Sequence, residues 1–208
     1  MWRGLGVANS DLRRFEVALD CHRRAQELLE EVDDRHGQAW NLNNAGVIHV
    51  DLEQYTEAAW HFERALELFL HTDDHQGQGF CLNNLGDTYR LLGRPACAIE
   101  YLERALLVQR GTHDHAGLRF TLTTLGDLHR DAGRTGEALG HYRAALATSR
   151  ELADQRTTAR VLANIAETLT ARGEIGEART HWRQALAIFD ELGDAQAETI
   201  RARLGEFR

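Results

Sequence analysis

Apolar residues recur at helical spacing along the chain, in pairs of segments that are separated by short polar turns. The first segment of one pair carries its apolar residues on one side of a helix, at Leu82, Leu85, Tyr89 and Leu92. Gly93 follows, which is typical of a helix end because glycine adopts the left-handed conformation without strain. Pro95 suits the first turn of the next helix, where its missing N–H has no partner to lose. The packing stripe of that second helix is Ala98, Leu102 and Ala105.

The pattern repeats every 40 residues, and five copies align without a gap. A small residue recurs in each first helix, at Gly6, Gly46, Gly86, Gly126 and Ala166. Two alanines recur in each second helix, at Ala18, Ala58, Ala98, Ala138 and Ala178 and at Ala25, Ala65, Ala105, Ala145 and Ala185. An aspartate recurs in each connecting turn, at Asp34, Asp74, Asp114, Asp154 and Asp194. Such columns predict an all-α protein built from helix-turn-helix repeats.

Each column has a physical reason. Small residues let paired helices approach to the near end of the usual ~8–10 Å separation. A turn aspartate can accept a hydrogen bond from a free N–H of the next helix and so cap it. One helical pair cannot bury its own apolar face, whereas stacked pairs can, which predicts a solenoid.

These columns resemble the tetratricopeptide repeat, whose pattern is W-x2-L-G-x2-Y, then A-x3-F, then Ala. The matching residues are Trp2, Leu5, Gly6 and Ala18; Leu42, Gly46, Ala58 and Phe62; Leu82, Leu85, Gly86, Tyr89 and Ala98; Leu122, Leu125, Gly126, Ala138 and Tyr142; and Leu162, Ile165, Ala178 and Trp182. The resemblance implies a right-handed superhelical solenoid of about five repeats plus a C-terminal capping helix.

Two departures refine the resemblance. The period is 40 residues instead of the family's ~34, and the family's late proline is absent, so we expect a longer second helix of about 18 residues. This longer form is similar to the repeats of kinesin light chain and Pins-type adaptors. It is also similar to the C-terminal repeats of actinobacterial transcriptional regulators that carry a signal-transducing ATPase module of the NB-ARC or SARP type.

We expect one tetratricopeptide domain over residues 1–208. Its repeats are predicted at about 1–33, 34–73, 74–113, 114–153 and 154–193, followed by a cap helix at 194–208 with Ala197, Ile200 and Leu204 as its apolar stripe. Met1 enters the first helix almost at its packing residues, which favours a fragment of a larger protein.

Charge and composition narrow the partners. The formal net charge is −8 and no basic stretch is clustered, so direct nucleic-acid contact is not expected. No apolar run approaches the ~20 residues that span a bilayer. Three cysteines in no C-x-x-C spacing favour a reducing compartment, which predicts a cytoplasmic protein.

The face of the first helices opposite the packing residues is the predicted binding groove, because the resembled family lines its inner surface with first helices. The candidate groove residues are Trp40, Asn43, Asn44, Phe80, Asn83, Asn84, Asp87, Arg90, Phe120, Thr124, Asp127, Arg130, Asn164 and Glu167. Asn amides can bond a peptide backbone of any sequence, and Arg90 and Arg130 can each grip a carboxylate. The alternative is that Arg90 pairs with Asp87 or Asp127 and that the aromatic rings pack on the preceding second helix.

Other chemistry has weaker support in the sequence. His and Asp crowd the turns, as at His36 and His75, but capping explains them better than zinc does. His61, His141 and His181 share a column that we expect to fill a seam between copies. No nucleophile elbow, phosphate loop or H-E-x-x-H motif is present, so we expect neither an enzyme nor a cofactor.

The sequence therefore predicts a non-catalytic module that binds a protein or peptide segment, or another domain of its parent protein, as the sensor or scaffold region of a bacterial regulator. The resembled family's dicarboxylate clamp needs lysines, and all 24 basic residues here are arginines. Two alternatives stay open: a peptide-pheromone sensor of a transcriptional regulator, and a scaffold that self-assembles through its N-terminal edge.

Overall fold

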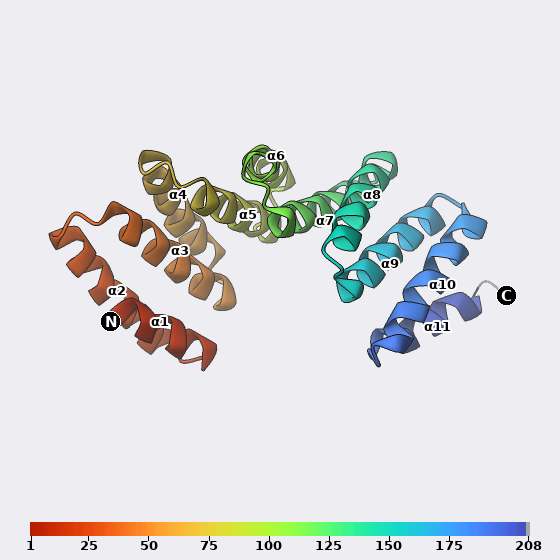
Figure 1. Ribbon diagram of the computed structural model, residues 1–208, viewed down its shortest axis with the longest axis horizontal. Coiled ribbons are helices and arrows are strands. Elements are labelled where there is room, and N and C mark those ends of the chain that lie inside the picture. Colours follow the sequence, from red (N-terminus) through yellow and green to blue (C-terminus); the bar gives the residue numbers. More distant parts are fainter. Residues whose placement is uncertain (207–208) are drawn as a thin grey trace. The chain divides into compact units, whose positions relative to one another are not determined.

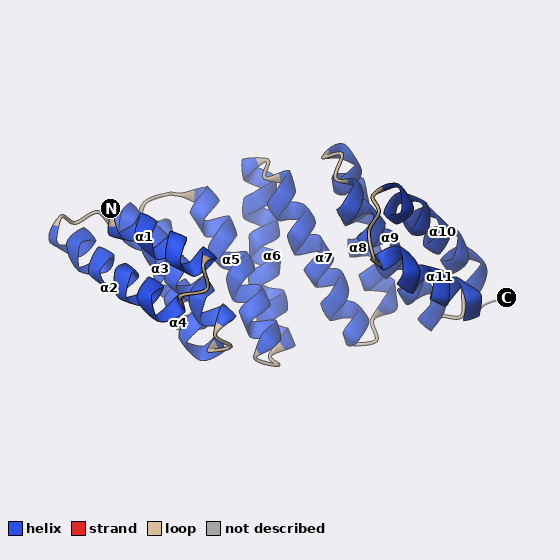
Figure 2. Ribbon diagram, turned by 90° about the horizontal axis from the view of Figure 1, so that it is seen from below, coloured by secondary structure: helices blue, strands red, loops and turns tan. Residues whose placement is uncertain are grey.

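The computed structural model describes residues 1–206, and within them eleven α-helices follow one another without a strand (Figures 1 and 2). The all-α class that the repeat predicts is therefore confirmed. The chain forms two compact units, which we call unit 1 (Met1–Asp114) and unit 2 (from His115). Unit 1 contains α1 (Trp2–Asp11), α2 (Phe15–Glu31), α3 (Arg35–Asp51), α4 (Tyr55–His71), α5 (His75–Leu91) and α6 (Pro95–Thr112). Unit 2 contains α7 (His115–Asp131), α8 (Thr135–Glu151), α9 (Gln155–Ala171), α10 (Ile175–Glu191) and α11 (Gln196–Glu206).

The long period is shared by both helices of a repeat. Each of α3, α4 and α5 has 17 residues and α6 has 18, so the first helix is as long as the second. The turn inside a repeat places one residue in the left-handed region, with φ of 69° at Gly93, 73° at Gly133 and 79° at Gly173. These are the glycines that the sequence marks as helix ends.

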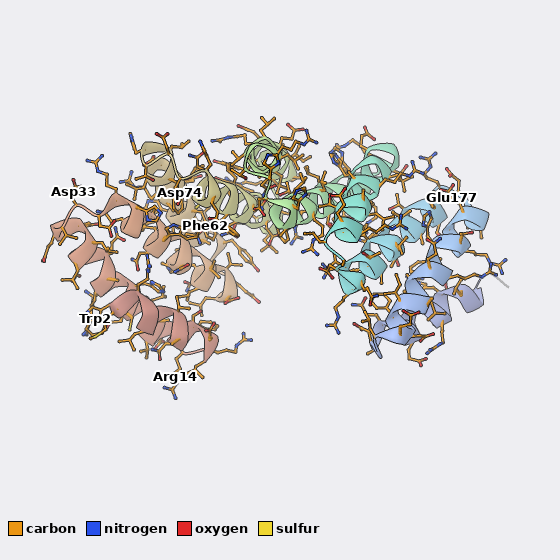
Figure 3. All side chains as sticks on the ribbon, viewed as in Figure 1. Trp2, Arg14, Asp33, Phe62, Asp74 and Glu177 are labelled. Atoms are coloured by element: carbon orange, nitrogen blue, oxygen red, sulfur yellow. The ribbon has the colours of Figure 1, made fainter. Side chains whose placement is uncertain are left out.

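The turn aspartates cap the helices that follow them. Oδ1 of Asp34 accepts a hydrogen bond from the backbone N–H of Gly37, and Oδ1 of Asp74 accepts one from Gly77, both at 2.9 Å. Asp154 does the same for Thr157 at 3.0 Å. Asp74 is labelled in Figure 3. The predicted capping role is thus confirmed for these three positions, and it fixes where each first helix begins.

The small residue of each first helix makes room for a side chain of its partner helix. A Cβ on Gly46 would lie 2.6 Å from the ring of Phe62 (labelled in Figure 3), and one on Gly126 would lie 2.4 Å from the ring of Tyr142. The nearest atoms at both positions are ring atoms, and at Gly86 they belong to the Leu102 side chain, so these glycines make room for side chains of the partner helix. Both rings are buried in consequence.

The two ends of the chain differ in how their helices pack. In α11 the predicted apolar stripe is buried at Ala197 and Ile200 and packs toward α10, which confirms a capping helix within the described residues. At the other end, Leu28 of α2 is exposed, and so are Leu12 and Val32, which directly follow α1 and α2. Among the helices described, none has the length and apolar character that crossing a bilayer requires.

Candidate functional site

In unit 1 the predicted groove residues lie on α3 and α5. The Trp40 ring meets Phe69 of α4 edge-on, with 5.0 Å between ring centroids, and meets Phe80 of α5 at 5.8 Å. The indole Nε1–H of Trp40 donates to Oδ2 of Asp74 at 3.2 Å. Trp40 is therefore half-buried and held in place, whereas 42% of Phe80 is exposed. The two rings form one apolar strip across neighbouring first helices.

The asparagines of this face separate into two kinds. Asn43 is buried, and its Oδ1 accepts hydrogen bonds from Asn84 Nδ2 at 3.0 Å and from the thiol of Cys81 at 3.3 Å. Burial raises the pKa of that thiol, so Cys81 remains a neutral donor. Asn83 is also buried, whereas Asn44 and Asn84 are half-buried and reach the surface. Asn43 ties α3 to α5, and Asn44 and Asn84 remain accessible to a ligand.

The charged residues of this face pair with each other. Oδ1 of Asp87 accepts from Nε and Nη2 of Arg90 at 2.9 and 2.7 Å. This is the local pairing that the sequence left open as an alternative to ligand binding. Because both side chains are partly exposed, the pair is worth at most about 1 kcal/mol, and a ligand carboxylate could replace Asp87.

In unit 2 the candidate face centres on Asp127 of α7. Its Oδ1 accepts from the buried Tyr142 hydroxyl at 2.6 Å and from Asn164 Nδ2 of α9 at 3.4 Å, and Arg130 lies 3.4 Å away. Burial, followed by this bond to a carboxylate, raises the pKa of Tyr142, so the phenol stays protonated and donates. Asp127 is thus held from three sides.

The remaining candidates of unit 2 differ in accessibility. Phe120 is 47% exposed, which makes it an available aromatic surface. Thr124 is buried, and its hydroxyl donates to the Phe120 carbonyl of its own helix at 3.1 Å, so it offers little to a ligand. Glu167 lies 3.8 Å from Arg203 of α11, beside a cavity of about 220 Å³ that Trp182 also lines.

Stacked rings between the two helices of a repeat were not anticipated from the sequence. His49 stacks on His61 with centroids 4.9 Å apart, Tyr89 on Tyr101 at 5.3 Å, and His129 on His141 at 5.1 Å. His61 also lines the space between α2 and α4, together with His22 and Gln26 of the preceding copy, so it lies at the seam between copies that the sequence predicts. For His141 the seam between copies stays a prediction. Each ring stacks on the first helix of its own repeat. The recurrence of a ring in both columns was the available signal.

The polar turns hold ion pairs and caps. His36 Nε2 lies 3.0 Å from Asp74 Oδ2, and Arg119 pairs with the capping Asp154. The backbone bond to Thr157 lowers the pKa of Asp154. In the part of the chain that the structure covers, no three His, Cys, Asp or Glu side chains converge as metal ligands would.

Comparison with known proteins adds the family. A sequence model described as tetratricopeptide repeat matches residues 1–71, 47–106 and 81–151, and a second model of the same description matches residues 158–189. Together they account for most of the chain. No curated protein sequence gives a significant match.

Solved structures with similar folds are numerous. The apo form of RapI superposes with a TM-score of 0.86 at 15% identity, over 92% of this chain and 70% of that one. A kinesin light chain with nearly identical TPR-like repeats from Podospora anserina gives 0.73 at 16% identity, over 92% and 94%. YrrB, described as a TPR protein with an unusual peptide-binding site, gives 0.62 at 23% identity, over 90% and 84%.

Proposed function

The chain belongs to the tetratricopeptide repeat family, and from that premise we propose that it binds a protein or peptide segment in the groove lined by its first helices, on the face opposite their packing residues. Binding would use shape, amide hydrogen bonds and aromatic contacts, with no covalent chemistry. The observation that carries the proposal is the strip on α3 and α5. There an exposed Phe80 ring adjoins Trp40, and the half-buried amides of Asn44 and Asn84 lie on the same face.

The chemistry of the strip favours an extended peptide. An asparagine amide both donates and accepts, so it can bond a peptide N–H and C=O whatever the peptide sequence. Rings that are already oriented by their neighbours, as Trp40 is by Asp74, bind with little loss of side-chain entropy. Aromatic residues of this kind carry most of the energy in many interfaces. The peptide-binding site named for YrrB, whose fold is similar, supports the same class of partner.

Finer features belong to the same proposal. The chain would act in the cytoplasm as the sensor or scaffold region of a bacterial regulatory protein, and the partner would be a separate protein or another domain of its parent. Unit 2 carries a candidate face of its own, with Phe120, Arg130 and Asn164. Arg90 in unit 1 and Arg130 in unit 2 would each take an acidic side chain of a partner.

The test is a selection from a random peptide library, followed by calorimetric titration of the selected peptide. We expect the double substitution Asn44→Ala and Asn84→Ala to weaken binding about tenfold or more, since two amide bonds to the peptide are lost. Gln184→Ala, an exposed amide on α10, is the matched control and should bind like the wild type. Equal affinity of the double variant and the wild type would remove the proposal.

Self-association is the second candidate, and one observation favours it. Leu12, Leu28 and Val32 of the α1–α2 region are exposed, Val32 by 72%. Leu28 and Val32 are four residues apart at the end of α2, and exposed apolar side chains that lie together mark an interaction surface in many proteins. Sedimentation velocity at several concentrations decides this: concentration-dependent dimers that Val32→Glu abolishes would support self-association, and a monomer throughout would exclude it.

A further inference from the structure

Unit 1 has a cavity on the side of α3 that faces away from the proposed groove. It has a volume of about 490 Å³ and lies between α2 and α4, with α3 as its floor. Figure 1 shows these three helices side by side. The α3 residues that line the cavity include Asn41, Ala45 and His49, which are four residues apart and share one side of the helix. The groove residues Asn43 and Asn44 lie on the other side. The cavity is therefore a separate site.

The repeats act as internal controls and show why the cavity is open here. Ala45 occupies a column that is otherwise filled by larger residues, namely Leu5, Leu85, Leu125 and Ile165. The equivalent space one repeat later lies between α4 and α6. There the hydroxyl of Tyr89 donates to Oε1 of Glu63 on α4 at 2.8 Å, and the hydroxyl of Tyr101 lies 3.5 Å from the same oxygen. These contacts tie α5 and α6 to α4.

The equivalent tie is missing around the cavity. In the 40-residue repeat, His49 and His61 occupy the columns of Tyr89 and Tyr101. Arg23 occupies the column of Glu63. Arg23 instead bonds along its own helix, to Asp20 at 2.6 Å and Glu27 at 2.9 Å. The space between α2 and α4 is thus left open because Ala45 is smaller, and His49 and His61 are shorter, than the residues in the same columns one repeat later.

The walls carry features that the repeat pattern does not require. Trp60 is 56% exposed and borders the cavity, in a column that is otherwise polar or small: Asp20, Glu100, Gly140 and Thr180. Its ring meets His61 edge-on at 4.9 Å, and His61 stacks on His49. An exposed indole beside two stacked imidazoles is a surface on which a flat ring can pack.

The floor is polar and fixed in orientation. Asn41 Nδ2 donates to the His22 carbonyl at 2.9 Å and to Gln26 Oε1 at 3.0 Å, so Asn41 Oδ1 must accept from His22 Nδ1, 2.8 Å away. One repeat later, Phe62 and Cys81 occupy the columns of His22 and Asn41. A few ordered polar groups in the lining of a cavity are typical of small-molecule sites, which usually measure about 300–1,000 Å³.

We propose that this cavity binds a neutral, planar aromatic molecule, whose ring packs against Trp60 and the His49–His61 pair and whose polar edge meets the Asn41–Gln26 network. Neutrality follows from the charges: Arg23 and Arg64 line the cavity together with Glu27 and Glu30, and Arg23 and Arg64 are each paired along their own helix. The charged side chains argue against an apolar helix as the occupant, because its apolar face would remove solvent from Arg23, Glu27, Glu30 and Arg64 together.

The test uses N-phenyl-1-naphthylamine, a neutral molecule in which one N–H joins a planar naphthalene to a phenyl ring and whose fluorescence rises in apolar surroundings, titrated into the full chain. We expect saturable one-to-one binding. Ala45→Leu, which copies Leu85, and Trp60→Glu, which copies Glu100, should each weaken it about tenfold or more, since each removes space or ring contact. Leu107→Glu removes an apolar residue that is 71% exposed on α6, outside the cavity, and should leave binding unchanged.

The anionic analogue 1-anilinonaphthalene-8-sulfonate should bind more weakly than the neutral probe, and a preference for the anion would overturn the predicted ligand class. Absence of saturable binding by the wild type, unchanged affinity in Ala45→Leu, or an equal loss in Leu107→Glu would each overturn the site. Thermal melting of every variant shows that it is folded, and Ala45→Leu should melt no lower than the wild type.

Discussion

Asn84 of α5 donates a hydrogen bond from Nδ2 to Oδ1 of Asn43 on α3, over 3.0 Å. Asn43 Oδ1 accepts both this bond and the one from the Cys81 thiol in a buried place, whereas Asn84 is only half-buried. Two asparagines of one candidate face therefore differ in role: Asn43 stabilises the fold, and Asn84 is available to a partner.

Asn43→Ala should lower the free energy of unfolding by about 1–3 kcal/mol, because it leaves the Cys81 thiol and an Asn84 donor without their acceptor in a buried place. Asn44→Ala, at the half-buried neighbouring position, should change it by less than about 0.5 kcal/mol. Urea denaturation measures both. Equal effects of the two substitutions would contradict the structural role given to Asn43.

Gly126→Ala should destabilise unit 2 by about 1–3 kcal/mol, because its new methyl group would lie 2.4 Å from the Tyr142 ring. Gly140→Ala is the control within the same unit: nothing lies within 4 Å of a Cβ there. Alanine should stabilise that helix by about 0.5–1 kcal/mol. Thermal melts with opposite shifts would fit this account, and a neutral Gly126→Ala would refute it.

Stability should fall as the pH drops from about 6.5 toward 4. Burial, followed by the nearby His49 and His22, lowers the pKa of His61 to about 4, and burial lowers the pKa of His22 as well. A histidine whose folded pKa is depressed favours folding above its unfolded pKa, ~6.5. That contribution is lost as protons bind the unfolded chain.

The pair His49→Tyr and His61→Tyr, which copies the stacked Tyr89 and Tyr101, should flatten this pH dependence. His71→Gln, at an exposed position, should leave the dependence as in the wild type. The measurement is the urea midpoint of each protein between pH 7.5 and 4.5. A wild-type midpoint that does not move over this range would be inconsistent with neutral buried histidines.

Asp154→Ala should cost about 0.5–2 kcal/mol, because the N–H of Thr157 loses its cap at the start of α9. Glu191→Ala, on the exposed end of α10, is the control and should cost less than about 0.5 kcal/mol. The bond to Thr157 lowers the Asp154 pKa, so the cap is fully present above about 3.9 and lost as the pH falls below it. Acid titration of the difference in stability checks this sign.

The sequence predicts the fold well because residues that end, cap and pack helices recur at the same positions in the five repeats. The turn glycines, the capping aspartates and the alanine columns all agree with one another, and the helices follow them. The length of the first helix was less evident, since a period alone does not say how residues divide between two helices.

The candidate face was less predictable. Helical periodicity gives the direction of Asn43, Thr124 and Asp127, but not the neighbours that they meet. Thr124 turns onto its own backbone, and Asp127 is bound by Tyr142 from the adjacent helix. The cavity behind α3 depends on a difference in side-chain volume at Ala45, which becomes visible only when the five copies are compared column by column.

The most direct measurement of the groove is nuclear magnetic resonance of the asparagine and glutamine side-chain amides during titration with a selected peptide. We predict that the signals of Asn44 and Asn84 shift in proportion to occupancy, while that of Gln184 stays in place. Shifts confined to the second helices α2, α4 and α6, with Asn44 and Asn84 unmoved at saturation, would contradict the account.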